Sequence, residues 1–291
     1  PLFSTVDRLL PGKETYRFVR CNRCGLIYVN PQPSWEERAA HYPLTYRGYR
    51  RLQTTSSPLQ RWSMAYGLQK RLNLLAAHCD GGRLLDIGCG GGDFLHHVAQ
   101  HAGWQGYGVE RTPAMARAAR RTYGLSTMVG DLLSLPFPAS RFDAVTLWTV
   151  LEHTPDPALA LQECAHLLRS GGVLIVRTVT AESRGARLFG PCWVGYDAPR
   201  ILFVFSRPTL RQLLNRAGFE VLRMQSCFHD FHPFLWSLQN RIAVSVPSPR
   251  LRTVLYAFAA SWPVRLLTFP FFALQTRRGE NSFVTAIARK R

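Results

Sequence analysis

The amino-acid sequence predicts an α/β fold built on a doubly wound sheet, because short apolar runs typical of buried parallel strands alternate with helical segments from about residue 83 onward. A glycine-rich turn, residues 88–92, directly follows the first of these runs. The next two runs end beside acids, Glu110 and Asp131. Parallel strands bring their carboxyl ends to one edge of a sheet, and ligands of such folds lie at that edge. The sequence therefore predicts a ligand site there.

The individual elements follow from the apolar pattern and from helix-capping residues. Thr112 is a capping residue and Pro113 suits a first helical turn, so a helix is expected to begin there. Strands are expected from Arg83 to the glycine-rich turn, in a short run before Gly130, and at residues 105–110, 142–148, 172–179, 219–227 and 282–288. Helices are expected at residues 93–101, 112–123, 155–169 and 206–217.

The glycine-rich turn excludes one class of cofactor. A dinucleotide fingerprint needs glycine at its first, third and sixth places, and here the sixth place is Asp93. The turn still lets the backbone approach a ligand, and the helix that follows favours an anionic group at its N-terminus. S-adenosylmethionine offers a carboxylate and no phosphate, so it is the expected cofactor. Glu110, 22 residues after Gly88, has the spacing of a ribose ligand.

With these motifs the chain resembles the class I S-adenosylmethionine-dependent methyltransferases, and more narrowly a small-molecule family. The motifs are DIGCGGG at residues 86–92, the acid Glu110, and LEH at residues 151–153 before a proline-rich turn. The resemblance covers about residues 68–226 and the last strand. It implies a methyltransferase with a Rossmann-like, seven-stranded, mostly parallel sheet whose last strand is antiparallel.

The resemblance also implies which residues bind the cofactor. Asp86, Gly88, Cys89 and Gly90 would surround its methionine part, Glu110 would hold its ribose diol, Asp131 and Leu132 its adenine, and Trp148 would line the pocket. Arg111 is a further expected cofactor-binding residue. The alternative is an ordinary turn between a strand and a helix.

Candidates for the chemistry come from two segments. Methyl transfer is an in-line displacement, so a base is needed only if the acceptor must lose a proton. His153 is the candidate base, and a helix-capping or pocket-shaping histidine is the alternative. Residues 195–206 resemble a family motif in which PRH precedes an aromatic run, but Ile201 replaces its histidine. Tyr196, Asp197 and Arg200 remain as substrate-side candidates, and Arg200 would pair with an acceptor anion or with a neighbouring acid.

The expected acceptor is an oxygen, or next a carbon, of a small metabolite or of a lipid-linked or saccharide precursor. Pro191-Cys192 lies in the wrong place for a cytosine-type nucleophile, and an Asn-Pro-Pro-Tyr turn typical of amino-group methylation is missing after residue 148. Two alternatives stay open. One is an RNA methyltransferase, and the other is a non-catalytic binding module that keeps the fold.

Two domains are expected, an extension over residues 1–59 and a catalytic domain over residues 60–291. The extension contains Cys21 and Cys24 in a CxxCG turn, which is half of a zinc ribbon. Zinc needs four ligands, and His41 and Cys79 are the only recruits in the sequence. Zinc binding and a metal-free turn are both open.

The net charge of +18 would attract anionic partners, but the basic residues are spread along the chain and all except three are arginine, so nucleic acid is not the expected partner. The seven cysteines show no disulfide framework, which favours a reducing cytoplasm.

An apolar insertion is expected at residues 228–280. Arginines flank its apolar runs, at Arg250 and Arg252 before and Arg277 and Arg278 after. This pattern is typical of a segment that rests on an anionic membrane at residues 250–278, which would place the protein at the inner face of the membrane. A helical cap on the substrate pocket or a homodimer contact are the alternatives.

Overall fold

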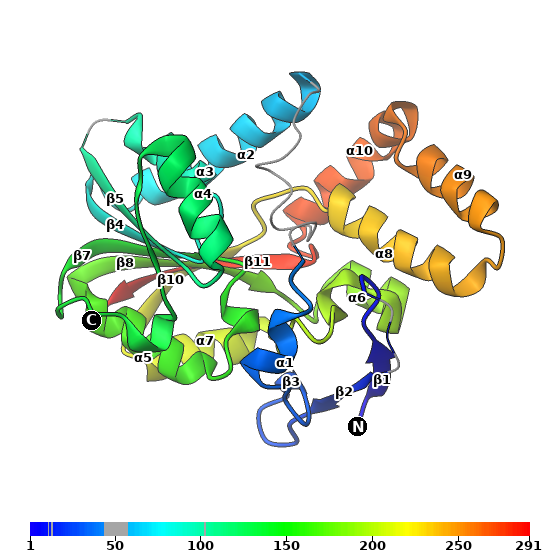
Figure 1. Cartoon of the computed structure of the whole chain (residues 1–291), viewed down its shortest axis with the longest axis horizontal. Helices are drawn as coiled ribbons and strands as arrows, with labels where there is room; N and C mark the ends of the chain where they lie inside the picture. Colours follow the sequence, from blue (N-terminus) through cyan, green and yellow to red (C-terminus); the bar gives the residue numbers. More distant parts are fainter. Residues whose placement is uncertain (11, 13, 44–57, 102) are drawn as a thin grey trace. The chain divides into compact units, whose positions relative to one another are not determined.

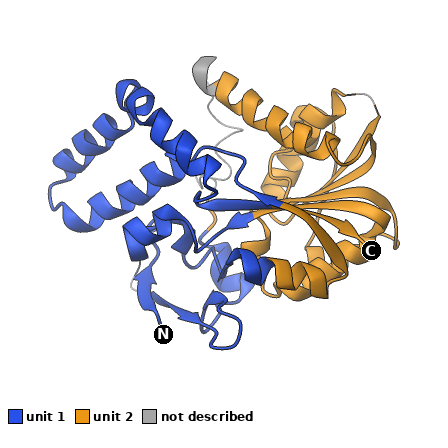
Figure 2. Ribbon diagram, turned by 180° about the vertical axis from the view of Figure 1, so that it is seen from behind, with its two compact units in different colours: residues 1–41, 178–210, 224–285 blue, residues 42–177, 211–223, 286–291 orange. Residues whose placement is uncertain are grey.

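The computed structural model describes residues 1–10, 12, 14–43, 58–101 and 103–291 (Figure 1). Its contacts form two compact units (Figure 2). One comprises residues 1–41, 178–210 and 224–285, and the other residues 42–177, 211–223 and 286–291. The division predicted near residue 59 stays a prediction. The contacts also group residues 1–41 in one unit with residues 178–210 and 224–285.

The second unit holds most of a seven-stranded sheet with the strand order β10-β11-β8-β7-β4-β5-β6. The strands are β4 (Gly82–Ile87), β5 (Trp104–Glu110), β6 (Ser126–Val129), β7 (Phe142–Trp148), β8 (Leu168–Val179), β10 (Phe219–Gln225) and β11 (Phe283–Lys290). Strands β6, β5, β4, β7 and β8 pair in parallel, and the C-terminal strands are antiparallel. The predicted mostly parallel sheet with its antiparallel last strand is confirmed.

Helices cover both faces of this sheet. They are α2 (Pro58–Ala76), α3 (Asp93–Ala99), α4 (Pro113–Tyr123), α5 (Pro157–Leu167) and α7 (Arg207–Arg216). Helices α3 and α4 lie on one face and α5 on the other (Figure 1). Helix α5 begins two residues later than expected because the Asp156 carboxylate caps it, accepting from the backbone nitrogens of Ala158 and Leu159.

The first unit contains a four-stranded sheet in the order β1-β2-β3-β9 that the sequence reasoning missed. Its strands are β1 (Phe3–Val6), β2 (Thr15–Arg20), β3 (Ile27–Val29) and β9 (Phe203–Val204). The N-terminal strands are only four, six and three residues long, so each is too short to give a clear alternation of buried and exposed positions. Strand β9 comes from a distant aromatic run, and Val204 pairs with Ile27.

Helices α1 (Trp35–Ala39) and α6 (Arg184–Phe189) also belong to the first unit. The predicted apolar insertion before the last strand is helical, as expected. It forms α8 (Phe231–Ser245), α9 (Pro249–Ala259) and α10 (Trp262–Arg277).

Candidate functional site

The glycine-rich turn after β4 lies against the end of β5. The backbone nitrogens of Gly88 and Cys89 both donate to the carbonyl of Val109, at 2.7 and 3.1 Å. Gly88 has a φ of +68°, and a Cβ there would lie 2.4 Å from Cγ2 of Val150. Gly90 also has a positive φ, but a Cβ there would have no atom within 4 Å. The turn therefore presents its backbone to open space at Gly90, as a ligand cradle requires.

Glu110, the last residue of β5, supports this turn from the neighbouring strand. Its Oε2 accepts from the nitrogen of Gly90 at 2.9 Å, and its Oε1 accepts from the nitrogen of Thr112 at 2.8 Å. Burial raises the pKa of this carboxyl, although the backbone donors oppose the shift. The Thr112 side chain and the Arg111 backbone also donate to this carboxylate, so the hydroxyls of a ribose diol would bind in exchange for some of these donors. The geometry fits the nucleoside expected from the sequence.

Asp86 belongs to β4, the strand that leads into the glycine-rich turn. Its Oδ1 accepts from the Thr146 hydroxyl of β7 at 2.6 Å, and burial raises the pKa of the carboxyl to about 7. Cys89 is also buried, and a Cβ on Gly108 would lie 2.8 Å from its Sγ, so the thiol packs against β5. Burial raises the pKa of this thiol, which leaves it a neutral packing group. Cys89 contributes its backbone to the turn.

The buried Asp86 predicts how stability depends on pH. The native carboxyl holds its proton up to about pH 7, whereas an unfolded aspartate loses it near pH 4. The folded ligand-free protein then binds more protons, so its stability falls as the pH rises through this window. Asp86→Asn is expected to flatten that slope and to raise the Tm above pH 7. Thermal denaturation over a pH series measures both, and an unchanged slope in the variant would assign it to another group.

Trp148 ends β7 and packs edge-to-face against Phe94 of α3, with ring centroids 5.5 Å apart. The guanidinium of Arg71 lies 4.9 Å from the Trp148 ring centre. Its charge opposes the rise that burial causes in the pKa of Asp86. Arg71 is a donor suited to a carboxylate, and the sequence reasoning missed it. It lies in α2, ahead of the glycine-rich turn, and its only signal is the basic pair that it forms with Lys70.

Asp131 and Arg111 form an ion pair beyond the ends of β6 and β5. Arg111 Nη2 lies 3.0 Å from Asp131 Oδ2, and both side chains are about a third exposed, so the pair adds little stability. Asp131 also accepts from the nitrogen of Leu133 and so caps a short 3₁₀ turn, residues 132–134. Leu132 is buried in that turn. These residues lie at the carboxyl edge, as predicted.

His153 closes a 3₁₀ turn, residues 151–153, that follows β7. Its Nδ1 lies 3.3 Å from the hydroxyl of Tyr42, a second residue that the sequence reasoning missed. The chain leaves β7 through Thr149, which has a φ of +61°. A non-glycine residue in this region stores strain, and such strain concentrates at functional sites.

A comparison with protein families identifies the domain. A methyltransferase domain model matches residues 60–224, which is more than half of the chain. The chain belongs to the class I S-adenosylmethionine-dependent methyltransferases. S-adenosylmethionine is the cofactor of this family, and the residues around Gly90 and Glu110 fit it. The predicted family, fold and cofactor are confirmed.

Curated relatives of this methyltransferase match part of it. Ubiquinone biosynthesis O-methyltransferases from Xanthomonas oryzae and Xylella fastidiosa are each 36% identical, over 138 and 122 residues. The matches cover 41% and 38% of this chain, and 56% and 46% of the relatives. The chain thus spans about half the length of these proteins.

Solved structures extend the likeness. The cyclase SpnF is 26% identical with a TM-score of 0.51, over 76% of this chain and 80% of that one. A S-adenosylmethionine-dependent methyltransferase from Archaeoglobus fulgidus is 18% identical with a TM-score of 0.52, over 78% of this chain and 94% of that one. The second likeness shows the fold alone.

Tyr196 and Arg200 belong to the first unit of the methyltransferase, and both are buried there. Tyr196 packs in an aromatic core, with ring centroids 4.8 Å from Phe3 and 5.0 Å from Trp193. Arg200 is fully buried and donates to the carboxylates of Asp7 and Asp197. Of the two roles predicted for Arg200, the structure shows the second, which is pairing with a neighbouring acid. A role toward an acceptor anion would require these contacts to break.

Cys21 and Cys24 lie in the turn between β2 and β3. Hydrogen bonds from the backbone of Cys24 and Arg23 lower the pKa of the Cys21 thiol. His41, one predicted recruit, instead bonds through Nδ1 to Asp7 Oδ2 at 2.5 Å. Within the described ranges, no three or more His, Cys, Asp or Glu side chains are grouped for a metal. Zinc stays a hypothesis that rests on two thiols.

Proposed function

We propose that this methyltransferase moves the methyl group of S-adenosylmethionine to a hydroxyl oxygen of a small, apolar or lipid-linked acceptor. The observation that carries the proposal is the placement of His153. It follows β7, a parallel neighbour of β4, so it lies at the same edge of the sheet as the glycine-rich turn. The O-methyltransferase activity of the curated relatives supports oxygen over carbon.

The chain's own residues have separate tasks in such a reaction. The turn at Gly88 and Gly90, which Glu110 supports, would hold the cofactor. When bound, S-adenosylmethionine would supply the activated methyl group. The contact of His153 Nδ1 with the Tyr42 hydroxyl orients the imidazole. Nε2 is then the atom that takes the proton of the acceptor hydroxyl as the carbon–oxygen bond forms.

His153→Gln is expected to lower kcat by about 100-fold or more, because general-base catalysis contributes about 10²–10⁴-fold. The affinity for S-adenosylmethionine is expected to stay unchanged. Transfer of labelled methyl groups to catechols, with and without an isoprenoid chain, measures the rate. His166→Gln is the matched control, since His166 is an exposed histidine of α5 in the same unit.

The pH profile separates a base from a residue that shapes the pocket. If His153 is a base, the wild-type rate rises with pH and the variant loses this rise. If the two profiles are parallel, His153 only positions the acceptor. If the cofactor binds and none of these acceptors is methylated, the result favours the alternative of a non-catalytic binding module.

A further inference from the structure

Helices α9 and α10 expose an apolar surface that their own packing does not use. Of the twenty exposed large apolar side chains in the described chain, eleven lie between Val244 and Leu274. No residue of α9 is buried, and α10 buries only Phe272 and Gln275. We define the α9–α10 apolar face by its six most exposed members, which are 54% to 81% exposed: Val254, Phe258, Trp262, Leu266, Leu267 and Phe269.

Contacts on the inner side of α9 and α10 stabilise these helices without any contribution from the α9–α10 apolar face. Phe231, Leu235 and Phe272 form a small buried cluster, and Tyr256 and Ala259 of α9 pack against it. Asp230 ties α10 to the start of β11, since it accepts from Gln275 Nε2 at 3.1 Å and from the Ser282 hydroxyl at 2.8 Å. The inner side is therefore stabilised by contacts within the unit.

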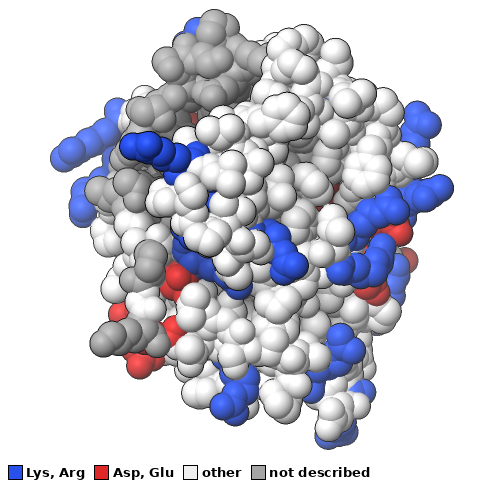
Figure 3. All heavy atoms as spheres, turned by 90° about the vertical axis from the view of Figure 1, so that its right-hand side faces the viewer, with Lys and Arg blue, Asp and Glu red and all other residues white. Residues whose placement is uncertain are grey.

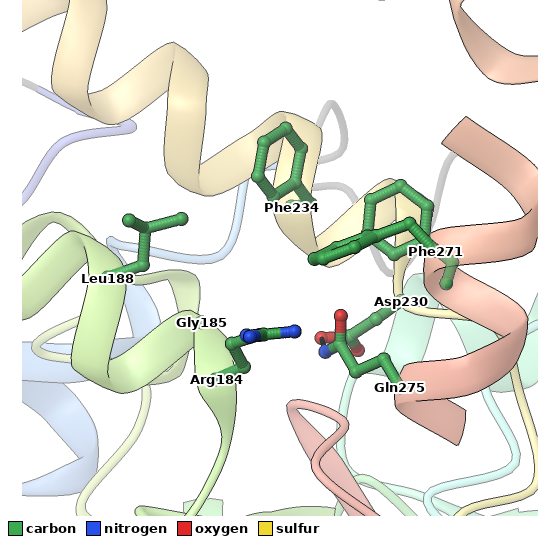
Figure 4. A pocket seen from close by; sticks show the side chains of 8 residues that line it. Arg184, Gly185, Leu188, Asp230, Phe234, Phe271 and Gln275 are labelled. Atoms are coloured by element: carbon green, nitrogen blue, oxygen red, sulfur yellow. Dashed lines mark hydrogen bonds between the residues drawn. The ribbon is translucent and has the colours of Figure 1, made fainter. Parts of the chain in front are cut away.

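A pocket of about 20 Å³ lies on this inner side, among α6, α8 and α10 (Figure 4). The guanidinium of Arg184 lies 5.1 Å from the ring centre of Phe271 at its wall. Asp230 and Gln275 point toward each other there and are bonded. The pocket is smaller than the usual small-molecule site of about 300–1,000 Å³, and its polar groups serve the packing of α10. The pocket therefore gives no reason for the apolar side chains that are exposed on the α9–α10 apolar face.

Charge identifies what the outer face fits. Arg250 and Arg252 lie in the first turn of α9, Arg277 and Arg278 lie at the end of α10, and Arg265 is the only charged residue between them. The sequence has no acid between Asp230 and Glu280. Figure 3 faces the side of the molecule on which these helices lie, and shows a broad uncharged surface with Lys and Arg toward its margins. An apolar face bordered by cations matches the acyl region and headgroups of an anionic bilayer.

We propose that the α9–α10 apolar face docks the protein on the surface of an anionic phospholipid bilayer. A second copy is a poorer occupant, because it would bring the same arginines against these without any acid to pair them. Among the described helices none is by itself long and apolar enough to cross a membrane. Helices α9 and α10 pass that test only together, with a bend of 59°. This geometry suits helices that lie in the headgroup layer, with Trp262 near the bend.

Docking does not depend on the acceptor, so it stands or fails apart from the proposed function. The test is flotation of the full chain with vesicles of phosphatidylcholine, with or without phosphatidylglycerol. We expect binding to the anionic vesicles, release by high salt, and at least about tenfold weaker binding to phosphatidylcholine alone.

A matched pair of variants locates the contact. Trp262→Glu is expected to weaken vesicle binding by about tenfold or more, because it replaces an apolar anchor with an anion. Trp62→Glu is the control, since Trp62 of α2 is also 65% exposed but lies outside the face. Unfolding curves for both variants confirm that they fold, as expected for exposed positions.

Three results would overturn the proposal. The first is the absence of flotation with anionic vesicles, and the second is equal weakening by the two tryptophan variants. The third is a stable dimer in sedimentation velocity that Trp262→Glu dissociates, since a second copy would then cover the face. Arg277→Gln together with Arg278→Gln adds a further check, because it is expected to reduce the preference for phosphatidylglycerol.

Discussion

Arg200→Met is expected to lower the free energy of unfolding by about 3 to 5 kcal/mol, the usual cost of removing one partner from a buried ion pair. The Arg200 side chain is fully buried, and its Nη2 lies 2.7 Å from both Asp7 Oδ1 and Asp197 Oδ1. Its Nη1 also donates to the carbonyl of His41 at 3.0 Å. The variant leaves the buried carboxylate of Asp7 without its guanidinium partner, held only by His41 and by the backbone nitrogens of Leu9 and Leu10. Urea unfolding of both proteins at neutral pH measures the loss.

The same cluster predicts a loss of stability in acid. Burial favours a higher pKa for Asp7, but hydrogen bonds from Arg200 and His41 outweigh it and hold the value at about 2. Because the folded pKa lies below the unfolded one, this contribution to stability is present above pH 4 and is lost as the pH falls toward 2.

The double variant Asp7→Asn, Arg200→Met removes both charges and is expected to recover part of the stability that Arg200→Met loses. If Arg200→Met is as stable as the wild type but fails to methylate acceptors, then Arg200 binds the acceptor.

Glu110→Ala is expected to weaken the binding of S-adenosylmethionine by about 100-fold or more. It removes the carboxylate that fits the ribose diol and, with it, the acceptor for the Gly90 and Thr112 nitrogens. A hydrogen bond to a charged group contributes about 1.5–3 kcal/mol, so losing two of them reaches this range. Calorimetric titration of the cofactor into wild type and variant measures the change.

Two further variants separate cofactor contact from turn geometry. Glu110→Gln keeps the shape and one acceptor oxygen, so a smaller loss of about tenfold is expected. Glu220→Gln is the matched control, because Glu220 is an exposed acid of β10 in the same unit. Unchanged affinity in Glu110→Ala would show that Glu110 only supports the turn and that the ribose lies elsewhere.

The parts of the fold predicted from sequence are those with local signals. Phe142–Trp148 was predicted with both of its bounds, because it is a mostly apolar run ahead of a turn. Pro113 and Gly124 likewise delimit α4, since proline suits its first turn and Gly124 ends it with a φ of +66°. The glycine-rich turn and Glu110 were found because ligand approach restricts which residues fit those positions.

The missed features depend on contacts between distant segments. Strand β9 is only two residues long and pairs with β3 from another part of the chain, so no local pattern marks the sheet that they share. Arg200 pairs with Asp7 across 193 residues, and a carboxylate that distant looks like any surface acid in a sequence. Tyr42 meets His153 in the same way. Such pairings need the tertiary fold.

The central claim is that residues around Gly90 and Glu110 bind S-adenosylmethionine. Calorimetric titration of S-adenosylmethionine and S-adenosylhomocysteine into the wild-type protein, with NAD as the control, tests it most directly. The account predicts binding of both sulfur compounds with Kd values in the micromolar range and no binding of NAD, which lacks the matching carboxylate and needs the glycine that Asp93 replaces. If neither sulfur compound binds, or if NAD binds equally well, the claim is contradicted.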